Sequence, residues 1–526
     1  MKLKKYFYIS ALSLACVFTS CDAILNLSPE DYYGSGNFWT NASQVEGAMY
    51  GIHNQMRGSY DFLIKYGEAR GGTMNQLTSA LGTTQNWASP IKDNDFREDK
   101  AGVDDWGDFY SKILNLNVFI QKVSEECSFL SESERKQYLA QAHGIRAFYY
   151  FWMYRTWGGL PLIKTATVLD GKITAEGLYT KQSSPKTIMG FIKEEVNESE
   201  RLFGDKYLEV GKDDHCFWSL AATKMLKAEV YLWSAKVTTG DQTPDNKDIT
   251  TAKEALTPLI DRFKMLNDFG KLFNTKGKDN TESIFTLRFN EGEATNFFAN
   301  FIPAPNVFIG QVYDRDGDLI ETDTLQQNGT GLERHSYKWE LWSKYDADDQ
   351  RRDKTFFDYY YKDGKFRGAA CIKNMGHINS SNVRIYDGDI HIYRYADVLL
   401  TMAEIENYLG NPVAPWINEV RERAYGDKFA GHEYTDSDFT TNEKAILLER
   451  DKEFVTEGKR WFDLVRMKDA KDGKSLAFDA SVNYRENPNQ DLVPVLNYDT
   501  ESHKLLWPIS KNTRISDPEL DQNPGY

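Results

Sequence analysis

Apolar residues recur at helical spacing along much of the chain, and polar, turn-rich stretches separate these segments. Small and large residues are mixed on the apolar faces, which favours close packing of helices in pairs. No strict 34-residue repeat occurs, so the predicted pairs are only tetratricopeptide-like. The pattern predicts a mainly α-helical protein. The expected helices cover about 41–57, 131–157, 218–236, 393–409, 414–424 and 440–458.

Two of these helices have start signals in the sequence. Ser131 and Glu134 have the spacing of a capping box. In this motif the serine side chain accepts a hydrogen bond from a backbone N–H of the first turn, and the glutamate side chain accepts one from the backbone N–H of the serine. Thr440 and Glu443 repeat that spacing. The Gly-Gly-Leu-Pro sequence at 158–161 should end the helix that Ser131 opens, because proline cannot continue it.

Three long stretches between the helices are rich in Gly, Asn, Asp and aromatic residues. They cover about 70–106, 165–185 and 267–390. Loops of this length inside a folded domain are usually functional or disordered, and their Trp and Tyr content is typical of binding loops. No linker of flexible composition divides the chain, so we predict one body over 21–526. Its helical scaffold covers about 38–265 and 390–526, and a loop-rich excursion covers about 267–390.

The first residues have the pattern of a targeting segment rather than of a folded element. Three lysines at 2–5 precede an uncharged, mostly apolar run over 6–20, which is shorter than the roughly 20 residues that span a bilayer as a helix. Small residues then lead into Cys21, so 1–20 is predicted to be a lipoprotein signal peptide and Cys21 the acylated residue. Cys16 is a rival site, but it would leave a very short apolar run. An ordinary secretory signal with a chance cysteine is the alternative.

Composition narrows the class of protein further. The formal net charge is −15, and without the three signal lysines the chain has 60 basic against 78 acidic residues. Such a surface repels phosphate backbones, which argues against nucleic acid as a partner. Aromatic residues make up 14% of the chain, enough to build a core and to leave some rings for ligand stacking.

Motifs of catalysis and of metal binding do not occur in the sequence. There is no GxSxG, HExxH or P-loop motif. The eight histidines show no ligand spacing, and Cys127, Cys216 and Cys371 form no Cys/His cluster, which predicts buried thiols and no zinc site. Acid-rich stretches at 346–349 and 314–318 are compatible with an adventitious calcium, although neither has the glycine of an EF-hand loop at the right position. We expect no cofactor and no enzymatic activity.

Several segments have strongly recognisable motifs. They are the segment after Cys21 up to Phe-Trp-Thr at 38–40, RAFYY and WGGLPL within 146–162, LKAEVYL at 226–232, YRYADVLL within 393–404, ERDKEFVTEGKRWFDLVR at 449–466, and the ending 505–526. In this order they resemble the SusD (RagB/SusD) family of Bacteroidota outer-membrane lipoproteins. The resemblance covers nearly the whole chain. One departure is Asp451, where the family often has a basic residue.

The resemblance implies a SusD-like fold, in which tetratricopeptide-like helix pairs scaffold a loop-rich ligand-binding face. It implies a cell-surface lipoprotein of the outer membrane that captures oligosaccharides and passes them to a SusC-like TonB-dependent transporter. Such proteins are not catalysts. A peptide-binding member of the same family is one alternative, and a surface glycoside hydrolase is another.

Charged residues in the most recognisable motifs are expected to be structural. They are Arg394, Arg450, Glu453, Glu457, Arg460 and Asp463, and they lie among apolar neighbours in predicted helices. Charges in such surroundings are normally retained when they are paired. We therefore predict a buried ion-pair network that joins the last helices, rather than a binding site.

Ligand-binding residues are expected in the loops that lack family motifs. A sugar needs flat aromatic rings for its CH faces and amide or charged side chains for its hydroxyl groups. The first loop supplies Trp87 as a stacking platform and Asn75, Gln76 and Asn86 as hydrogen-bonding groups. The middle excursion supplies Tyr337 and Trp339. Trp106 precedes a predicted helix and is expected in the core.

Overall fold

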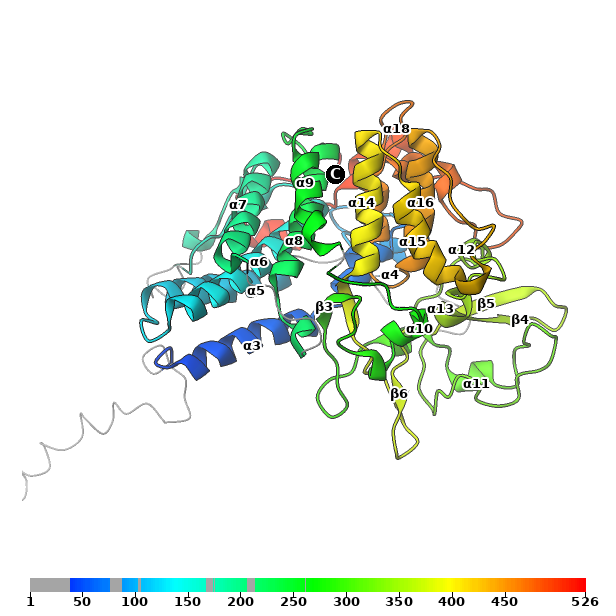
Figure 1. The fold of residues 1–526 in the computed structure, drawn as a ribbon. Coiled ribbons are helices and arrows are strands. Elements are labelled where there is room, and N and C mark those ends of the chain that lie inside the picture. Colours follow the sequence, from blue (N-terminus) through cyan, green and yellow to red (C-terminus); the bar gives the residue numbers. More distant parts are fainter. Residues whose placement is uncertain are drawn as a thin grey trace, which may run out of the picture.

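The computed structural model has a mainly α-helical fold, as predicted (Figure 1). It describes residues 38–75, 88–102, 106–166, 174, 176–205, 213–260 and 262–526. The longer helices are α3 (Ala42–Gly58), α5 (Gly107–Glu125), α6 (Glu132–Trp157), α7 (Pro185–Phe203), α8 (Leu220–Lys236), α9 (Asp248–Leu256), α14 (Tyr395–Leu409), α15 (Ala414–Tyr425), α16 (Phe439–Glu453) and α17 (Arg460–Arg466). The shorter helices are α4 (Ala88–Lys92), α10 (Phe269–Leu272), α11 (Pro305–Phe308), α12 (Trp339–Ser343), α13 (Arg352–Thr355), α18 (Tyr498–Glu501) and α19 (Lys511–Ser516).

Helices that follow one another in the sequence pack side by side. α6 packs against α5 and α7, and α8 packs against α7 and α9. α14 packs against α15 and α16, and also against α8 and α9, so it joins the early helices to the late ones. Figure 1 shows these groups next to each other, with α5 to α9 on the left and α14 to α16 on the right. The prediction of tetratricopeptide-like helix pairs is confirmed.

The predicted starts of α3 and α6 are confirmed by their hydrogen bonds. The Asn41 side chain accepts from the Gln44 N–H at 3.1 Å at the start of α3. At the start of α6 the Ser131 hydroxyl accepts from the Glu134 N–H at 3.2 Å, and Glu134 accepts from the Ser131 N–H at 2.9 Å. α6 is followed by Gly158, whose φ of 76° is one that glycine adopts without strain.

The second predicted capping box, Thr440 with Glu443, is wrong. The residue that caps α16 is Asp438, which accepts from a backbone N–H of the first turn at 3.1 Å. Glu443 points inward and pairs with Lys236, and both side chains are buried. The predicted helix over 440–458 is also too long, because α16 ends earlier and a turn precedes α17. A buried cation needs a carboxylate partner, and that requirement decides the direction of Glu443.

The predicted helix over 393–409 begins two residues later than expected, at Tyr395. The residues directly before α14 belong to strand β8 (Ile390–Arg394). This strand pairs antiparallel with β3 (Ser283–Leu287). The two strands lie far apart in the sequence. A local apolar pattern does not reveal so distant a partner, so the helical interpretation extended into the strand.

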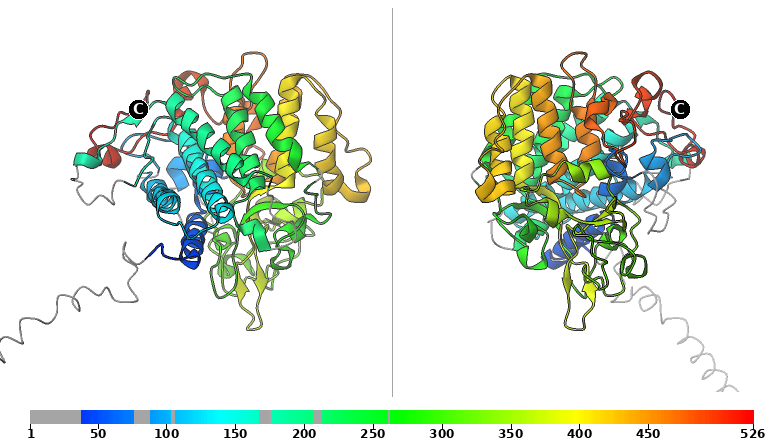
Figure 2. Two further views of the ribbon diagram at one scale, coloured as in Figure 1. Left: turned by 60° about the vertical axis from the view of Figure 1, so that its left-hand side comes forward. Right: turned by 90° about the vertical axis from the view of Figure 1, so that its right-hand side faces the viewer.

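The middle of the chain contains short strand pairs that the sequence pattern did not predict. β4 (Phe356–Tyr360) and β5 (Phe366–Cys371) form an antiparallel hairpin, and β6 (His377–Ile378) pairs with β7 (Arg384–Ile385). Outside this middle segment, β1 (Leu160–Pro161) pairs with β2 (Gln182–Ser183) between α6 and α7. Figure 2 shows the strands and loops of the middle segment gathered at one end of the helical part.

The core is centred on α6. Every residue from Gly144 to Trp157 is buried, because α5, α7 and α8 pack around this helix. Trp106 is 6% exposed and its ring lies edge-on to Trp157 at 5.5 Å, so its predicted place in the core is confirmed. Within the described parts of the chain, none of the helices combines the length and the apolar character that crossing a bilayer requires.

Candidate ligand-binding face

Two loops that lie far apart in the sequence meet at a short antiparallel bridge between Met74 and Tyr337. The Asn75 N–H donates to the Ser336 carbonyl at 3.0 Å. The Lys338 N–H donates to the Thr73 carbonyl at 2.8 Å. The sequence had supplied candidates from both loops without a reason to place them together. We call residues 73–75 and 336–339 the loop face.

Asn75 is held in place by the opposite loop. Its side-chain NH2 donates to the Ser336 hydroxyl at 2.9 Å and to the Tyr337 carbonyl at 3.2 Å. The side chain is only half-buried. Among the described residues nothing donates to its Oδ1, so the amide has an acceptor available for a ligand hydroxyl. Ser336 gave no signal in the sequence, because its role depends on the bridge.

The prediction that Tyr337 contacts a ligand is wrong. Its side chain is 1% exposed and its ring packs against Phe301 and Phe356 in the core. Its hydroxyl donates to Glu68 at 3.2 Å. The bridge with Met74 turns this ring inward, and a sequence pattern does not show which way a loop residue faces. The ring of Tyr337 therefore anchors the loop face to the core.

Glu68 lies beneath the loop face and is 2% exposed. It accepts from the Tyr337 hydroxyl and, at 3.3 Å, from the Gly458 N–H. Burial raises the pKa of the Glu68 carboxyl to about 8. The carboxyl is therefore mostly protonated at neutral pH. It links the loop face to the turn that precedes α17.

Trp339 is the first residue of α12, and its side chain is half-buried. α12 is fixed by Glu340, which accepts from the Arg485 backbone N–H at 2.8 Å and from its guanidinium at 3.0 Å. The hydrogen bond from Arg485 holds the pKa of the Glu340 carboxyl at about 2. Burial lowers the pKa of the neighbouring Lys338 to about 8. Trp339 therefore begins a turn of helix that Arg485 holds in place.

The remaining predicted site residues cannot be placed in the same way. Trp87, Gln76 and Asn86 lie outside the described residues, and so does the predicted acylated residue Cys21. Their roles stay predictions. The described part of the first loop ends at Asn75 and resumes at 88.

The predicted buried ion-pair network is confirmed. All six charged residues of the prediction are buried and paired. The pairs are Arg394 with Glu282 at 2.8 Å, with Glu453 at 2.5 Å and with Glu457 at 2.9 Å, Arg450 with Asp463 at 2.7 Å and with Asp397 at 3.1 Å, and Arg460 with Asp451 at 2.5 Å. Burial alone would raise the pKa of the Glu457 carboxyl, but Arg394 and Lys373 hold it below its usual value. The network joins β8, α14, α16 and α17.

Asp451, the departure from the family pattern, belongs to this network. Its carboxylate pairs with Arg460 and accepts from the Tyr484 hydroxyl at 2.6 Å. The side chains of Asp451 and Arg460 are almost fully buried. An acidic residue at this position neutralises a buried guanidinium, which is a structural reason for the departure.

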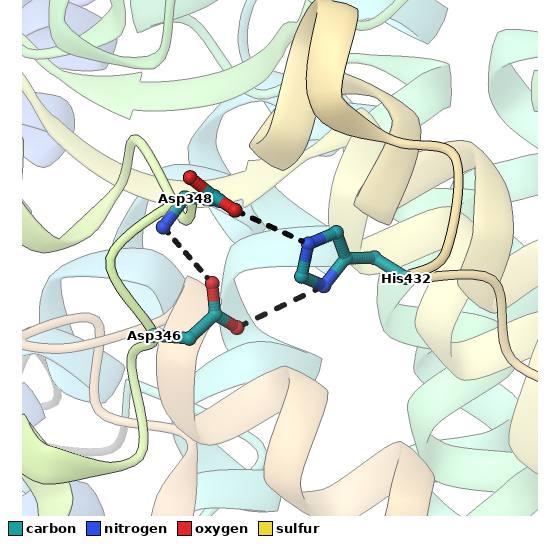
Figure 3. Close-up of side chains that lie close together, drawn as sticks. All are labelled: Asp346, Asp348 and His432. Atoms are coloured by element: carbon teal, nitrogen blue, oxygen red, sulfur yellow. Dashed lines mark hydrogen bonds and ion pairs between the residues drawn. The ribbon is translucent and has the colours of Figure 1, made fainter.

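One group of side chains in the described part of the chain has ligand atoms close enough together to hold a metal ion (Figure 3). Asp346 and Asp348 lie on either side of His432, with N···O distances of 4.0 and 3.7 Å. They face different ring nitrogens, whereas one cation would take a single nitrogen. Lys428 already pairs with Asp348, and the Tyr425 hydroxyl donates to Asp346 at 2.7 Å. The arrangement is that of an ion-pair contact between the 345–350 turn and the end of α15.

The two acid-rich stretches have other partners for their carboxylates. Asp349 is buried and pairs with Arg351 at 2.8 Å. The Asp314 side chain accepts from the N–H groups of Asp316 and Asp318 at 3.0 and 2.9 Å, so it closes its own turn. These bonds account for Asp349 and Asp314 without an ion.

Comparison with known proteins agrees with the architecture and the motifs. The model of the SusD family matches residues 325–526. A SusD superfamily protein from Bacteroides fragilis is 38% identical, with 93% of this chain and 100% of that chain covered and a TM-score of 0.86. A SusD-like protein, P38, from Formosa agariphila is 24% identical, over 97% of this chain and 96% of the relative. The chain belongs to the SusD family.

A more distant structure has the same fold. It is surface glycan-binding protein A from Bacteroides thetaiotaomicron, solved in complex with laminarihexaose. It is 18% identical, with 92% of this chain and 99% of that chain covered and a TM-score of 0.63. At this identity the likeness concerns the fold.

Proposed function

We propose that this chain is a cell-surface lipoprotein that captures oligosaccharides and delivers them to a SusC-like TonB-dependent transporter of the outer membrane. The observation that carries the proposal is the loop face, where the bridge brings the segment of Asn75 together with the distant segment that leads into Trp339. An indole ring and a fixed amide are the groups that recognise the CH faces and the hydroxyl groups of a sugar. The glycan ligand of a neighbour with the same fold supports this ligand class.

The buried carboxyl groups of Glu68 and Glu340, next to the loop face, are poorly suited to hydrolysis. A glycosidase needs two accessible carboxyl groups about 5 to 10 Å apart across the scissile bond. Glu68 has the raised pKa of a general acid, but Tyr337 covers it. Glu340 is engaged by Arg485 and has a lowered pKa. We propose a protein that holds its ligand and leaves it intact.

A panel of oligosaccharides and peptides tests the ligand class and the absence of catalysis together. The mature protein is incubated with each compound, and both binding and product size are measured. We expect an oligosaccharide to be depleted without shortened products. New reducing ends would overturn the binding proposal in favour of a hydrolase. Binding of peptides with no binding of any saccharide would identify a peptide-binding member instead.

The anchor and the transporter are tested in cells. Cys21→Ser should release the protein from the membrane and leave ligand affinity unchanged, because a lipid at the N-terminus makes no contribution to a loop-face site. Loss of affinity together with the anchor would contradict this separation. The wild-type protein should co-purify with a TonB-dependent barrel from outer membranes solubilised in mild detergent. Repeated absence of the barrel would overturn the transporter part of the proposal.

A further inference from the structure

A groove beside α3 has the features of a ligand site but contains none of the residues of the loop face. It consists of two adjoining hollows of about 390 and 250 Å³. Both are lined by Tyr50 of α3 and by Phe217, which precedes α8. In Figure 1 α3 lies at the lower left, well apart from α12 on the right. The groove is therefore a separate surface.

Two aromatic rings stand between the hollows. Tyr50 is 50% exposed, and its ring centroid lies 5.4 Å from that of the half-buried Phe217. The Tyr50 hydroxyl donates to Glu46 at 2.7 Å, which fixes the direction of the ring. Half-exposed rings of fixed direction on a concave surface are suited to stacking against the CH face of a sugar.

The second hollow is lined by a residue whose side-chain oxygen has no donor. Among the described residues, nothing donates to the buried side-chain oxygen of Gln141, which lines this hollow. The NH2 of the same amide faces the Gln137 carbonyl at 3.5 Å, so the oxygen is directed away from that carbonyl. A buried acceptor without a donor carries a free-energy cost. A ligand hydroxyl would remove this cost after a small rotation of the half-buried side chain.

The arginines that line the groove are already paired with carboxylates, and the exposed Glu46 of the second hollow accepts from Tyr50. Arg57 pairs with Glu293 at 2.5 Å, and Arg288 pairs with Asp389 at 2.9 Å. Burial lowers the pKa of His53 to about 4, so this imidazole is neutral at pH 7. A site without an unpaired cation favours an uncharged ligand over an anion.

We infer that the groove is a second saccharide site, which takes one or two rings of a neutral pyranose chain. Tyr50 and Phe217 stack against the sugar, and Gln141 accepts from a hydroxyl group. The hollows together have the volume that small ligands occupy in proteins, about 300–1,000 Å³. A second site would let one protein hold a glycan at two points, or hold one glycan while another occupies the loop face.

Cys216 provides a reporter for this groove. It lines the first hollow and is half-buried, whereas Cys127 and Cys371 are buried. Burial raises the pKa of the Cys216 thiol to about 11, so labelling with a disulfide reagent is followed at pH 9. The probes are methyl β-D-glucopyranoside, methyl β-D-galactopyranoside and methyl α-D-mannopyranoside. Sorbitol, which has hydroxyl groups but no ring, serves as the control.

At least one pyranoside at about 100 mM should slow the labelling about tenfold, as expected for a dissociation constant of about 10 mM. Tyr50→Ala should abolish the protection. Tyr361→Ala, which removes an equally exposed tyrosine elsewhere, should keep it. The proposal is overturned if no pyranoside slows the labelling, if sorbitol does so equally, or if Tyr50→Ala remains protected. Trp339→Ala should keep the protection, so failure of the groove and failure of the loop face are distinguishable.

Discussion

The buried ion-pair network and the loop face contain similar polar groups in opposite surroundings. In the network Arg394, Arg450 and Arg460 are almost fully buried, and each forms ion pairs with carboxylates. In the loop face Asn75 and Trp339 are half-buried and retain a surface toward solvent. The network coincides with the most recognisable family motifs, whereas the loop face lies outside them. The comparison indicates that the motifs maintain the scaffold, and it supports the proposal that ligand specificity lies in residues that carry no motif.

The largest expected effect is at the centre of the network. Arg394→Met should lower the free energy of unfolding by about 3–5 kcal/mol or more, because it leaves three buried carboxylates without this partner. Urea denaturation measures the change. Arg201→Met, which breaks an exposed pair with Glu198, is the control and should leave the midpoint unchanged. Equal midpoints for the two variants would show that the network is not structural.

Glu68, which lies between the two regions, should make stability depend on pH. Its pKa is about 8 in the folded protein and 4.5 in an ordinary environment, so the folded chain keeps a proton that the unfolded chain releases. Stability should therefore fall as pH rises from about 4.5 to about 8. The loss is at most about 5 kcal/mol, at about 1.4 kcal/mol for each unit of the difference between the two pKa values.

Glu68→Gln should flatten that dependence, since glutamine mimics the protonated carboxyl and does not ionise. Urea unfolding at pH 5, 6, 7 and 8 gives both curves. Glu125→Gln, at an exposed residue of α5, is the control and should follow the wild type. If Glu68→Gln and the wild type have parallel curves, Glu68 is ionised in the folded protein and the link between the regions is different from the one described.

A smaller effect is expected at the loop face, and it concerns affinity rather than stability. Trp339→Ala should weaken oligosaccharide binding about tenfold, which corresponds to about 1.4 kcal/mol of lost stacking. Calorimetry with the best ligand of the panel measures it. Trp416→Ala in α15, another partly exposed tryptophan, is the control. Trp87→Ala makes the same test for the part of the site outside the described residues. Unchanged affinity in either variant removes that ring from the site.

The smallest expected effect is that of Asn75→Ala, because the amide contributes one acceptor to a ligand. Affinity should fall about threefold, within the range of about 0.5–1.5 kcal/mol for one hydrogen bond. The exposed Asn246→Ala serves as the control in the same calorimetric series. A loss larger than that of Trp339→Ala would mean that the Asn75–Ser336 contact shapes the whole face and that stacking is secondary.

Much of the scaffold could be predicted from the sequence because its signals are local. Helical spacing and the Ser131–Glu134 capping box depend on residues within one or two turns. The errors arise where distant residues decide the outcome. Glu443 turns inward to reach Lys236, and the residues before α14 pair with a strand from the middle of the chain. Neither partner is visible in a local window.

The site was less predictable for the same reason. The sequence supplied Asn75 and Trp339 on chemical grounds, but not the bridge that brings their loops together. It also supplied Tyr337, whose ring the same bridge turns into the core. The groove beside α3 gave no signal at all, because Tyr50, Gln141 and Phe217 come from three separate elements. Residue type indicates what a side chain can do, and only the fold decides whether it is exposed.

The central claim is that ligand contacts the loop face and that the network only supports it. Hydrogen–deuterium exchange with and without the best oligosaccharide of the panel tests this claim most directly. Binding should slow exchange in 71–75 and 334–342 and leave 445–466 unchanged. Slower exchange in 445–466 with no change at the loop face would contradict the account.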